Sequence, residues 1–291
     1  MNIQIADKFH NYKKDFHLTA LGIGDLIFTF ILLKNKLINE SIYINLFFFT
    51  NNSWYPEPQN ALDFRIKLID FILKSNKDIS QNIYFTFYAN NNTSYLNQHI
   101  DYYKYLDHPN KWHLNLEYEY AIPIQEPYII FHTKTRFYNN FDMIQFRKKA
   151  IDLYKKIKTK YKIILLGERT FPRTFETKYR NIDTIYQELL TLKEKNDVID
   201  MTCESIYNEL DIDNYLKDIS IVSNAKYNIL ISSGGLLVSC LAFNHKSVIN
   251  YTSHQSDSSN ILPKYVDNVY FFKDFDKYEQ MVLEKLNVDI V

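Results

Sequence analysis

Glycine is scarce in this chain, with five residues among 291. The five lie in three stretches, and each stretch follows an apolar run with strand character: Gly22 and Gly24, then Gly167, then Gly234 and Gly235. Glycine tolerates positive φ and close contact with neighbouring chain, so a glycine-poor sequence is expected to keep it where the backbone requires it. The first and third stretches lead directly into apolar helix patterns. Backbone N–H groups at the start of a helix bind anions, so we predict an anion-binding site at each of these two junctions.

The chain also has few cysteines, no net charge and no long hydrophobic run. The two cysteines, Cys203 and Cys240, lack the spacing of a zinc site or a disulfide framework. The 34 Lys and Arg residues are balanced by 34 Asp and Glu residues, which argues against a nucleic-acid partner. The apolar run over residues 26–33 is too short to span a bilayer, and the N-terminus lacks a signal-peptide pattern. We therefore expect a cytoplasmic chain with no membrane span, for which peripheral membrane contact stays open.

Apolar residues make up 46% of the sequence, enough for a packed interior. Runs typical of buried strands, such as residues 41–50, alternate with helix-period patterns, such as residues 61–74. This alternation predicts an α/β fold with parallel, doubly wound sheets. The Pro123–Pro127 segment interrupts the pattern, so we expect two Rossmann-like lobes, residues 1–125 and 126–291, with a cleft between them.

The first candidate site is Leu21-Gly-Ile-Gly-Asp25, between a strand predicted over residues 16–21 and a helix predicted from Asp25. The stretch lacks the third glycine of the dinucleotide-binding fingerprint, so a redox Rossmann site is weakly indicated. An apolar-Gly-x-Gly-Asp stretch before an apolar helix resembles the N-terminal motif of the ADP-heptose heptosyltransferases, the family 9 glycosyltransferases of GT-B fold. The resemblance implies that Gly22 and Gly24 form an acceptor-side loop and that Asp25 is the catalytic base. The alternative is that Asp25 only stabilises the start of its helix.

The second candidate site is Phe131-His-Thr-Lys-Thr-Arg136, expected as a loop after a strand over residues 128–132. Two cations and two hydroxyls at the carboxyl end of a strand suit a diphosphate, and the matching segment of heptosyltransferases similarly offers such groups to the donor. Thr133, Lys134 and Arg136 are therefore predicted to bind the donor diphosphate. His132 could act as a second acid or base, or be a packed histidine.

The third and fourth candidate sites also follow predicted strands. Gly167, Glu168 and Arg169 resemble the GT-B segment that holds the nucleotide's ribose, with an ordinary surface Glu–Arg pair as the alternative. The Ser-Ser-Gly-Gly turn, the apolar helix and the strand that follow it resemble the donor-phosphate segment of heptosyltransferases. The family has Asp, Pro and His where this chain has Ser232, Gly235 and Leu237. The resemblance implies donor-phosphate contacts from four residues: Ser232, Ser233, Gly234 and Gly235.

Two Asp-x-Asp pairs imitate the signature of metal-dependent transferases. Asp211 and Asp274 each begin such a pair just before a predicted helix, where a carboxylate is expected to cap the helix. No metal and no cofactor is predicted. The sequence thus predicts an inverting, metal-independent glycosyltransferase that moves a sugar from a nucleotide-diphosphate donor to a glycan or glycolipid. Two alternatives stay open: a GT-B-like hydrolysing nucleotide-sugar epimerase, and a non-catalytic nucleotide- or glycan-binding module.

Overall fold

The chain forms two sheets of mainly parallel strands, covered by helices, and is therefore an α/β protein. The computed structural model of the chain describes residues 2–6, 16–18, 23–34, 43–48, 60–79, 84–89, 114–115, 117–118, 124–137, 140–170, 181–204, 211–231, 242–243, 247–252 and 269–287.

The smaller sheet has four parallel strands in the order β1-β4-β3-β2. Its strand β1 (Asn2–Ala6) pairs with β4 and extends a sheet that the sequence patterns predicted only from residue 16 onward. The remaining elements of this half are β2 (Phe16–Leu18), α1 (Ile23–Lys34), β3 (Tyr43–Phe48), α2 (Ala61–Ser75) and β4 (Tyr84–Ala89).

The larger sheet has seven strands, and only β7, which pairs with β5, is antiparallel. The path of the other strands is β11-β10-β9-β5-β6-β8. Its strands are β5 (Tyr128–Phe137), β6 (Lys162–Leu166), β7 (Asn181–Thr184), β8 (Val198–Asp200), β9 (Tyr227–Ile231), β10 (Ser247–Tyr251) and β11 (Val269–Phe272). Its helices are α3 (Asn140–Lys156), α4 (Tyr186–Leu189), the 3₁₀ turn η4 (Leu190–Glu194), α5 (Ile212–Asn224) and α8 (Phe275–Leu286).

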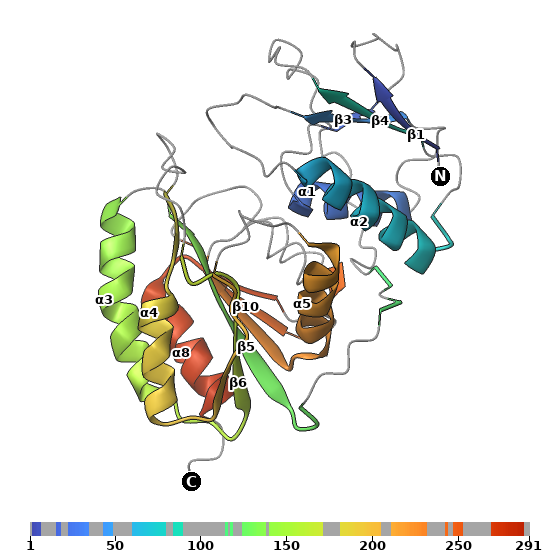
Figure 1. Cartoon of the computed structure of the whole chain (residues 1–291). Coiled ribbons are helices and arrows are strands. Elements are labelled where there is room, and N and C mark those ends of the chain that lie inside the picture. Colours follow the sequence, from blue (N-terminus) through green and yellow to red (C-terminus); the bar gives the residue numbers. More distant parts are fainter. Residues whose placement is uncertain are drawn as a thin grey trace.

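Both faces of the larger sheet are buried. Consecutive strand residues point to opposite sides, and the residues on each side pack into an apolar core. In β5, Ile129 and Phe131 pack with α3, α4 and α8, whereas Tyr128 and Ile130 belong to a second core on the side of α5. Figure 1 shows α3, α4 and α8 on one face and α5 on the other. This two-sided burial explains why the strands are nearly continuous apolar runs in the sequence.

The core on the α5 side continues into the N-terminal half of the chain. Buried residues of α1 and α2, such as Leu26 and Phe64, belong to the same apolar cluster as Val222 and Leu230. The Phe64 ring meets Tyr215 of α5 edge to face, with centroids 5.5 Å apart. Helices α1 and α2 thus lie between the small sheet and the rest of the molecule (Figure 1). The boundary predicted near residue 125 stays a prediction, as does the cleft.

The two Asp-x-Asp pairs act as the predicted helix caps. The Asp211 carboxylate accepts a hydrogen bond from the Asp213 backbone N–H at the start of α5. The Asp274 carboxylate accepts from the Asp276 N–H at the start of α8 in the same way. Each cap provides a partner for an N–H group that the helix leaves unpaired.

Three predicted element boundaries were wrong. The sequence pattern predicts a helix over residues 182–195, but this stretch begins with strand β7 and continues as α4 and a 3₁₀ turn. The strand expected over residues 128–132 continues to Phe137, so the second candidate site is a strand and not a loop. Helix α1 begins at Ile23, which puts Gly24 and Asp25 inside its first turn.

Among the described helices, none has the length and apolar character needed to cross a bilayer.

Candidate functional site

The order of the strands reverses between β5 and β9. From β5 the chain moves outward to β6 and β8, and it then returns to the other side of β5 for β9, β10 and β11. Ligands of open α/β sheets bind outside the carboxyl ends of the strands at such a reversal point. The candidate site is therefore the region where β5 and β9 end, together with the adjacent end of β6.

Strand β5 changes register against β9 at this point. Phe131 pairs with Ile229 and Thr135 pairs with Ile231, so four residue steps on β5 match two on β9. Such an irregularity bends a strand and changes the direction of its side chains. The residues between the two pairs include Thr133 and Lys134, two of the residues predicted to bind the donor diphosphate.

Gly167 follows β6 and lies against Thr133. Its φ is +114°, a conformation that residues with a side chain rarely adopt. A Cβ atom added to Gly167 would lie 2.5 Å from Thr133 Oγ1 and 3.4 Å from Thr133 N. The glycine is therefore required both by the backbone conformation and by the close approach of the β5 chain.

Glu168 and Lys134 form an ion pair at the same edge of the sheet. The distance between Lys134 Nζ and Glu168 Oε1 is 3.8 Å, and the two side chains are 20% and 2% exposed. A carboxylate buried to this extent is rare unless it is paired with a cation. The ammonium group keeps some contact with solvent, whereas the carboxylate has almost none.

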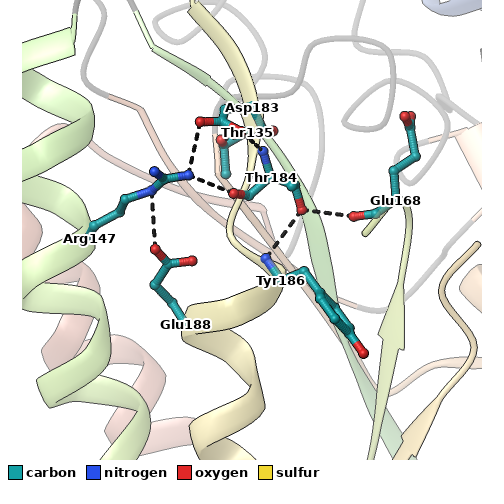
Figure 2. Close-up of polar contacts among 7 residues, drawn as sticks. All are labelled: Thr135, Arg147, Glu168, Asp183, Thr184, Tyr186 and Glu188. Atoms are coloured by element: carbon teal, nitrogen blue, oxygen red, sulfur yellow. Dashed lines mark hydrogen bonds and ion pairs between the residues drawn. The ribbon is translucent and has the colours of Figure 1, made fainter. Parts of the chain in front are cut away.

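Strand β7 holds this edge in place (Figure 2). Arg147 of α3 donates hydrogen bonds from Nη2 to Asp183 Oδ2 (2.9 Å) and to the Thr184 carbonyl oxygen (2.8 Å), and its Nε lies 3.1 Å from Glu188 Oε1. The Thr184 hydroxyl donates to the backbone carbonyl of Glu168 at 2.8 Å. The chain that follows β6 is therefore attached through β7 to helix α3.

Arg169 is oriented by residues that the sequence analysis did not identify. Its Nε donates to Thr202 Oγ1 (2.8 Å), its Nη2 lies 3.6 Å from Asp200 Oδ2, and its guanidinium lies 5.6 Å from the Tyr186 ring centroid. The Tyr186 hydroxyl donates to Asp200 Oδ2 at 2.6 Å. These contacts hold an arginine, 42% exposed, at the edge of the candidate site.

The Asp200 carboxylate is stabilised in its charged form. Burial by itself raises the pKa of Asp200, but hydrogen bonds from Thr202 and Tyr186, together with the charge of Arg169, lower it to about 2. The charge on Asp200 therefore persists at neutral pH and keeps Arg169 in position.

His132 is a buried, neutral histidine. It is 1% exposed, and its Nε2 lies 3.2 Å from Asn228 Oδ1. Burial lowers the pKa of His132 to about 4, although the hydrogen bond to Asn228 acts in the opposite direction. Of the two roles considered for His132, the packed histidine is the one that agrees with this environment.

Two further groups near this edge have raised pKa values. Burial raises the pKa of Asp218, which is partly buried on α5, to about 7, although the charge of Lys217 lowers it. Burial, together with the negative charges of Glu168 and Asp218, raises the pKa of the Cys203 thiol to about 11. Cys203 is thus a thiol at neutral pH and a poor nucleophile.

The structure brings several predicted site residues together and leaves others undescribed. Thr133 and Lys134, in the second half of β5, meet Gly167 and Glu168, which follow the end of β6. Arg136 pairs through its backbone with Ile182 of β7, and its side chain lies outside the described part of the chain, as does the side chain of Asp25. Also outside the described residues are Gly22, Ser232, Ser233, Gly234 and Gly235.

One feature of the sequence could have led to two of the residues that were missed. The sequence predicts a short strand over residues 198–201, and Asp200 and Thr202 lie at its carboxyl end, where polar residues next to a site are expected. Arg147 gave no such signal, because a cation on an amphipathic helix normally faces solvent.

Among the described residues, no three His, Cys, Asp or Glu side chains come together as metal ligands.

Comparison with known proteins adds little. No family model matches the chain, and no curated protein matches its sequence. Among solved structures, a similar chain is the dodecameric iron-containing heptosyltransferase TibC in complex with ADP-D-beta-D-heptose, with a TM-score of 0.42 and 13% identity. The alignment covers 93% of this chain and 63% of TibC, so this chain spans less than two thirds of that neighbour. At that TM-score and identity, the likeness establishes neither a shared family nor a shared activity.

Proposed function

We propose that the chain is a glycosyltransferase that moves a sugar from a nucleotide-diphosphate donor to a hydroxyl of a glycan or glycolipid. The observation that carries the proposal is the position of Thr133, Lys134 and Gly167 at the reversal point of a parallel sheet. A partly exposed ammonium group beside a required glycine is suited to an anionic ligand. The sequence motifs, in the same order along the chain as in glycosyltransferases of GT-B fold, support a nucleotide-linked diphosphate as that ligand.

The proposal extends to the arrangement of the donor. Its diphosphate would lie between β5 and residues 232–235, which follow β9 in the sequence and lie outside the described residues. Ile231, the last residue of β9, pairs with Thr135, and residues 232–235 follow Ile231 directly in the sequence. The nucleotide would extend along Gly167 and Arg169, where the guanidinium held by Asp200 and Thr202 is partly exposed.

The proposed chemistry is inverting and needs no metal. Asp25, in the first turn of α1 and therefore at the carboxyl edge of the small sheet, would remove the proton from the acceptor hydroxyl as its oxygen attacks the anomeric carbon. The sugar–phosphate bond breaks on the opposite side of that carbon. Lys134 and Arg136 would stabilise the charge on the departing nucleoside diphosphate.

The experiment that tests the donor is thermal unfolding with UDP, GDP, ADP, CMP or dTDP, each with and without EDTA. A ligand at 100 times its Kd stabilises the folded state by about 2.7 kcal/mol, which shifts the Tm of a chain of this size by a few degrees. We expect one nucleotide to raise the Tm and EDTA to leave that shift unchanged. A chain that none of the nucleotides stabilises would contradict the proposed donor site.

A second assay separates the transferase from the two alternatives. Incubation of the sugar-linked form of the stabilising nucleotide with a broad acceptor set should yield a glycosylated acceptor and a free nucleoside diphosphate in equal amounts. Free sugar as the main product would favour the hydrolysing epimerase. Binding with no product from any acceptor would favour the non-catalytic binding module.

A further inference from the structure

The ion pair between Lys134 and Glu168 carries an inference about Glu168, and this inference rests on the proposed function. The sequence motif suggested that Glu168 holds the ribose of the nucleotide. The side chain is only 2% exposed, however, and its Oε1 lies 3.8 Å from Lys134 Nζ. A carboxylate in this position has little surface left for a sugar hydroxyl.

The backbones that carry the two charges are connected through one residue of β7. Thr184 is the strand partner of Lys134, and its hydroxyl donates to the carbonyl of Glu168 at 2.8 Å. Arg147 fixes Thr184 in turn, through the Thr184 carbonyl and the neighbouring Asp183 (Figure 2). Both ends of the ion pair therefore start from fixed backbone.

A buried ion pair contributes little to stability on balance, because the cost of removing both charges from water offsets their attraction. Such a pair can instead fix the position of a side chain before a ligand binds. A lysine side chain loses up to about 2 kcal/mol of rotamer entropy when it is immobilised. A carboxylate that already holds the ammonium group removes part of that cost before a ligand arrives. The Lys134 side chain is 20% exposed, so a ligand can reach it from the solvent side.

We propose that Glu168 is a positioning residue, which holds the Lys134 ammonium group at the donor diphosphate and does not contact the ribose. Glu168 acts on the ligand only through Lys134. Its effect on binding must then disappear when Lys134 is absent, and it must be the same for a diphosphate that has no ribose.

The test is a double-mutant cycle of Glu168→Gln and Lys134→Met, read out as the Kd of the stabilising nucleoside diphosphate and of inorganic pyrophosphate. Lys134→Met should weaken binding of both by roughly 10- to 100-fold, since a charge-assisted contact is lost. Glu168→Gln should weaken binding of both ligands by a similar factor, on the order of 10-fold. The double variant should bind no more weakly than Lys134→Met, to within about 2-fold.

The controls separate positioning from damage to the fold. Lys162→Met, at the opposite edge of the sheet, removes a lysine that pairs with two exposed carboxylates and should leave both Kd values unchanged. Glu168→Asp keeps the charge and should recover part of the affinity that Glu168→Gln loses. Losses that add in the double variant, or a Glu168→Gln loss seen with the nucleotide but absent with pyrophosphate, would overturn the positioning role and leave the proposed function standing. A wild-type chain that binds none of these ligands would overturn the proposed function, and the inference with it.

Discussion

The two edges of the larger sheet each contain a lysine paired with carboxylate, in very different surroundings. At the amino edge, Lys162 lies 3.9 Å from Glu126 and 3.7 Å from Asp197, and these carboxylates are 69% and 66% exposed. At the carboxyl edge, Lys134 lies 3.8 Å from Glu168, which is 2% exposed. The three distances are nearly equal, whereas the exposed fractions of the carboxylates differ widely.

The difference in burial gives the ion pairs at the two edges different energetic consequences. The exposed pairs of Lys162 are screened by solvent and contribute little. The buried Glu168 costs desolvation energy and belongs to a series of buried polar residues near the carboxyl edge. That series comprises His132, Thr133, Thr135, Glu168, Asn250 and Thr252. Apolar residues at these positions would avoid that desolvation cost, so the buried polar series supports the proposed ligand site at the carboxyl edge.

The largest effect is expected at the carboxyl edge of the smaller sheet. Asp25→Asn should lower the rate of sugar transfer by roughly 10²- to 10⁴-fold, since a general base is worth that much. The nucleotide-dependent rise in Tm should remain, because the proposed role of Asp25 is toward the acceptor and not toward the nucleotide. Measurement of kcat at saturating donor checks this prediction. A variant that retains more than about a tenth of the activity would show that Asp25 is not the base.

A large loss of stability is expected where β5 and β6 approach each other. Gly167→Ala should lower the free energy of unfolding by roughly 2–4 kcal/mol, because the residue has positive φ and its Cβ would collide with Thr133. Urea unfolding measures the loss. The Thr133→Ala change in the same chain makes room for that Cβ and should recover the steric part of the loss. Full additivity of the two losses would argue against the close approach.

The pH dependence of stability should contain two opposing contributions. His132 has a folded pKa of about 4 and an ordinary value of 6.5, so between these pH values the unfolded chain binds the extra proton and stability falls as the pH is lowered. The total is on the order of 3 kcal/mol. Asp218 has a folded pKa of about 7 and an ordinary value of 3.8, so over that range stability falls as the pH is raised.

Variants of the two groups should therefore change the pH profile in opposite directions. Asp218→Asn should leave a chain that gains stability from pH 4 to 6.5, and His132→Gln should leave one that loses it. Urea unfolding at a series of pH values between 4 and 7 measures both slopes. Equal profiles for the two variants would show that neither group titrates as its burial indicates.

The smallest effect is expected at the amino edge. Lys162→Met should change the free energy of unfolding by less than about 0.5 kcal/mol, because its carboxylate partners are exposed and screened. Urea unfolding at low and high salt checks this. A loss of more than 1 kcal/mol would remove the contrast between the two edges.

Most of the secondary structure could be predicted from the sequence, since most strands are apolar runs, the helices have an apolar period, and α5 and α8 begin with Asp caps. Apolar runs predict strands over residues 162–166, 247–251 and 269–272, and the structure has strands with these bounds. Strand β7 was missed because Asn181–Thr184 has no apolar run, and its place is determined by pairing with β5 and by Arg147. Such pairing is long-range and leaves no local pattern.

The sequence by itself determined that the chain is an α/β protein, that Gly167 occupies a special backbone position and that Asp211 and Asp274 cap helices. Each of these follows from a local property: apolar period, freedom of φ, or the reach of a short carboxylate. Only the tertiary structure decided that β5 shifts register at Thr133 and Lys134, that Glu168 is buried beside Lys134, and that Asp200 holds Arg169. Burial and register depend on which strands become neighbours, and that choice is made by the whole packed core and not by any single segment.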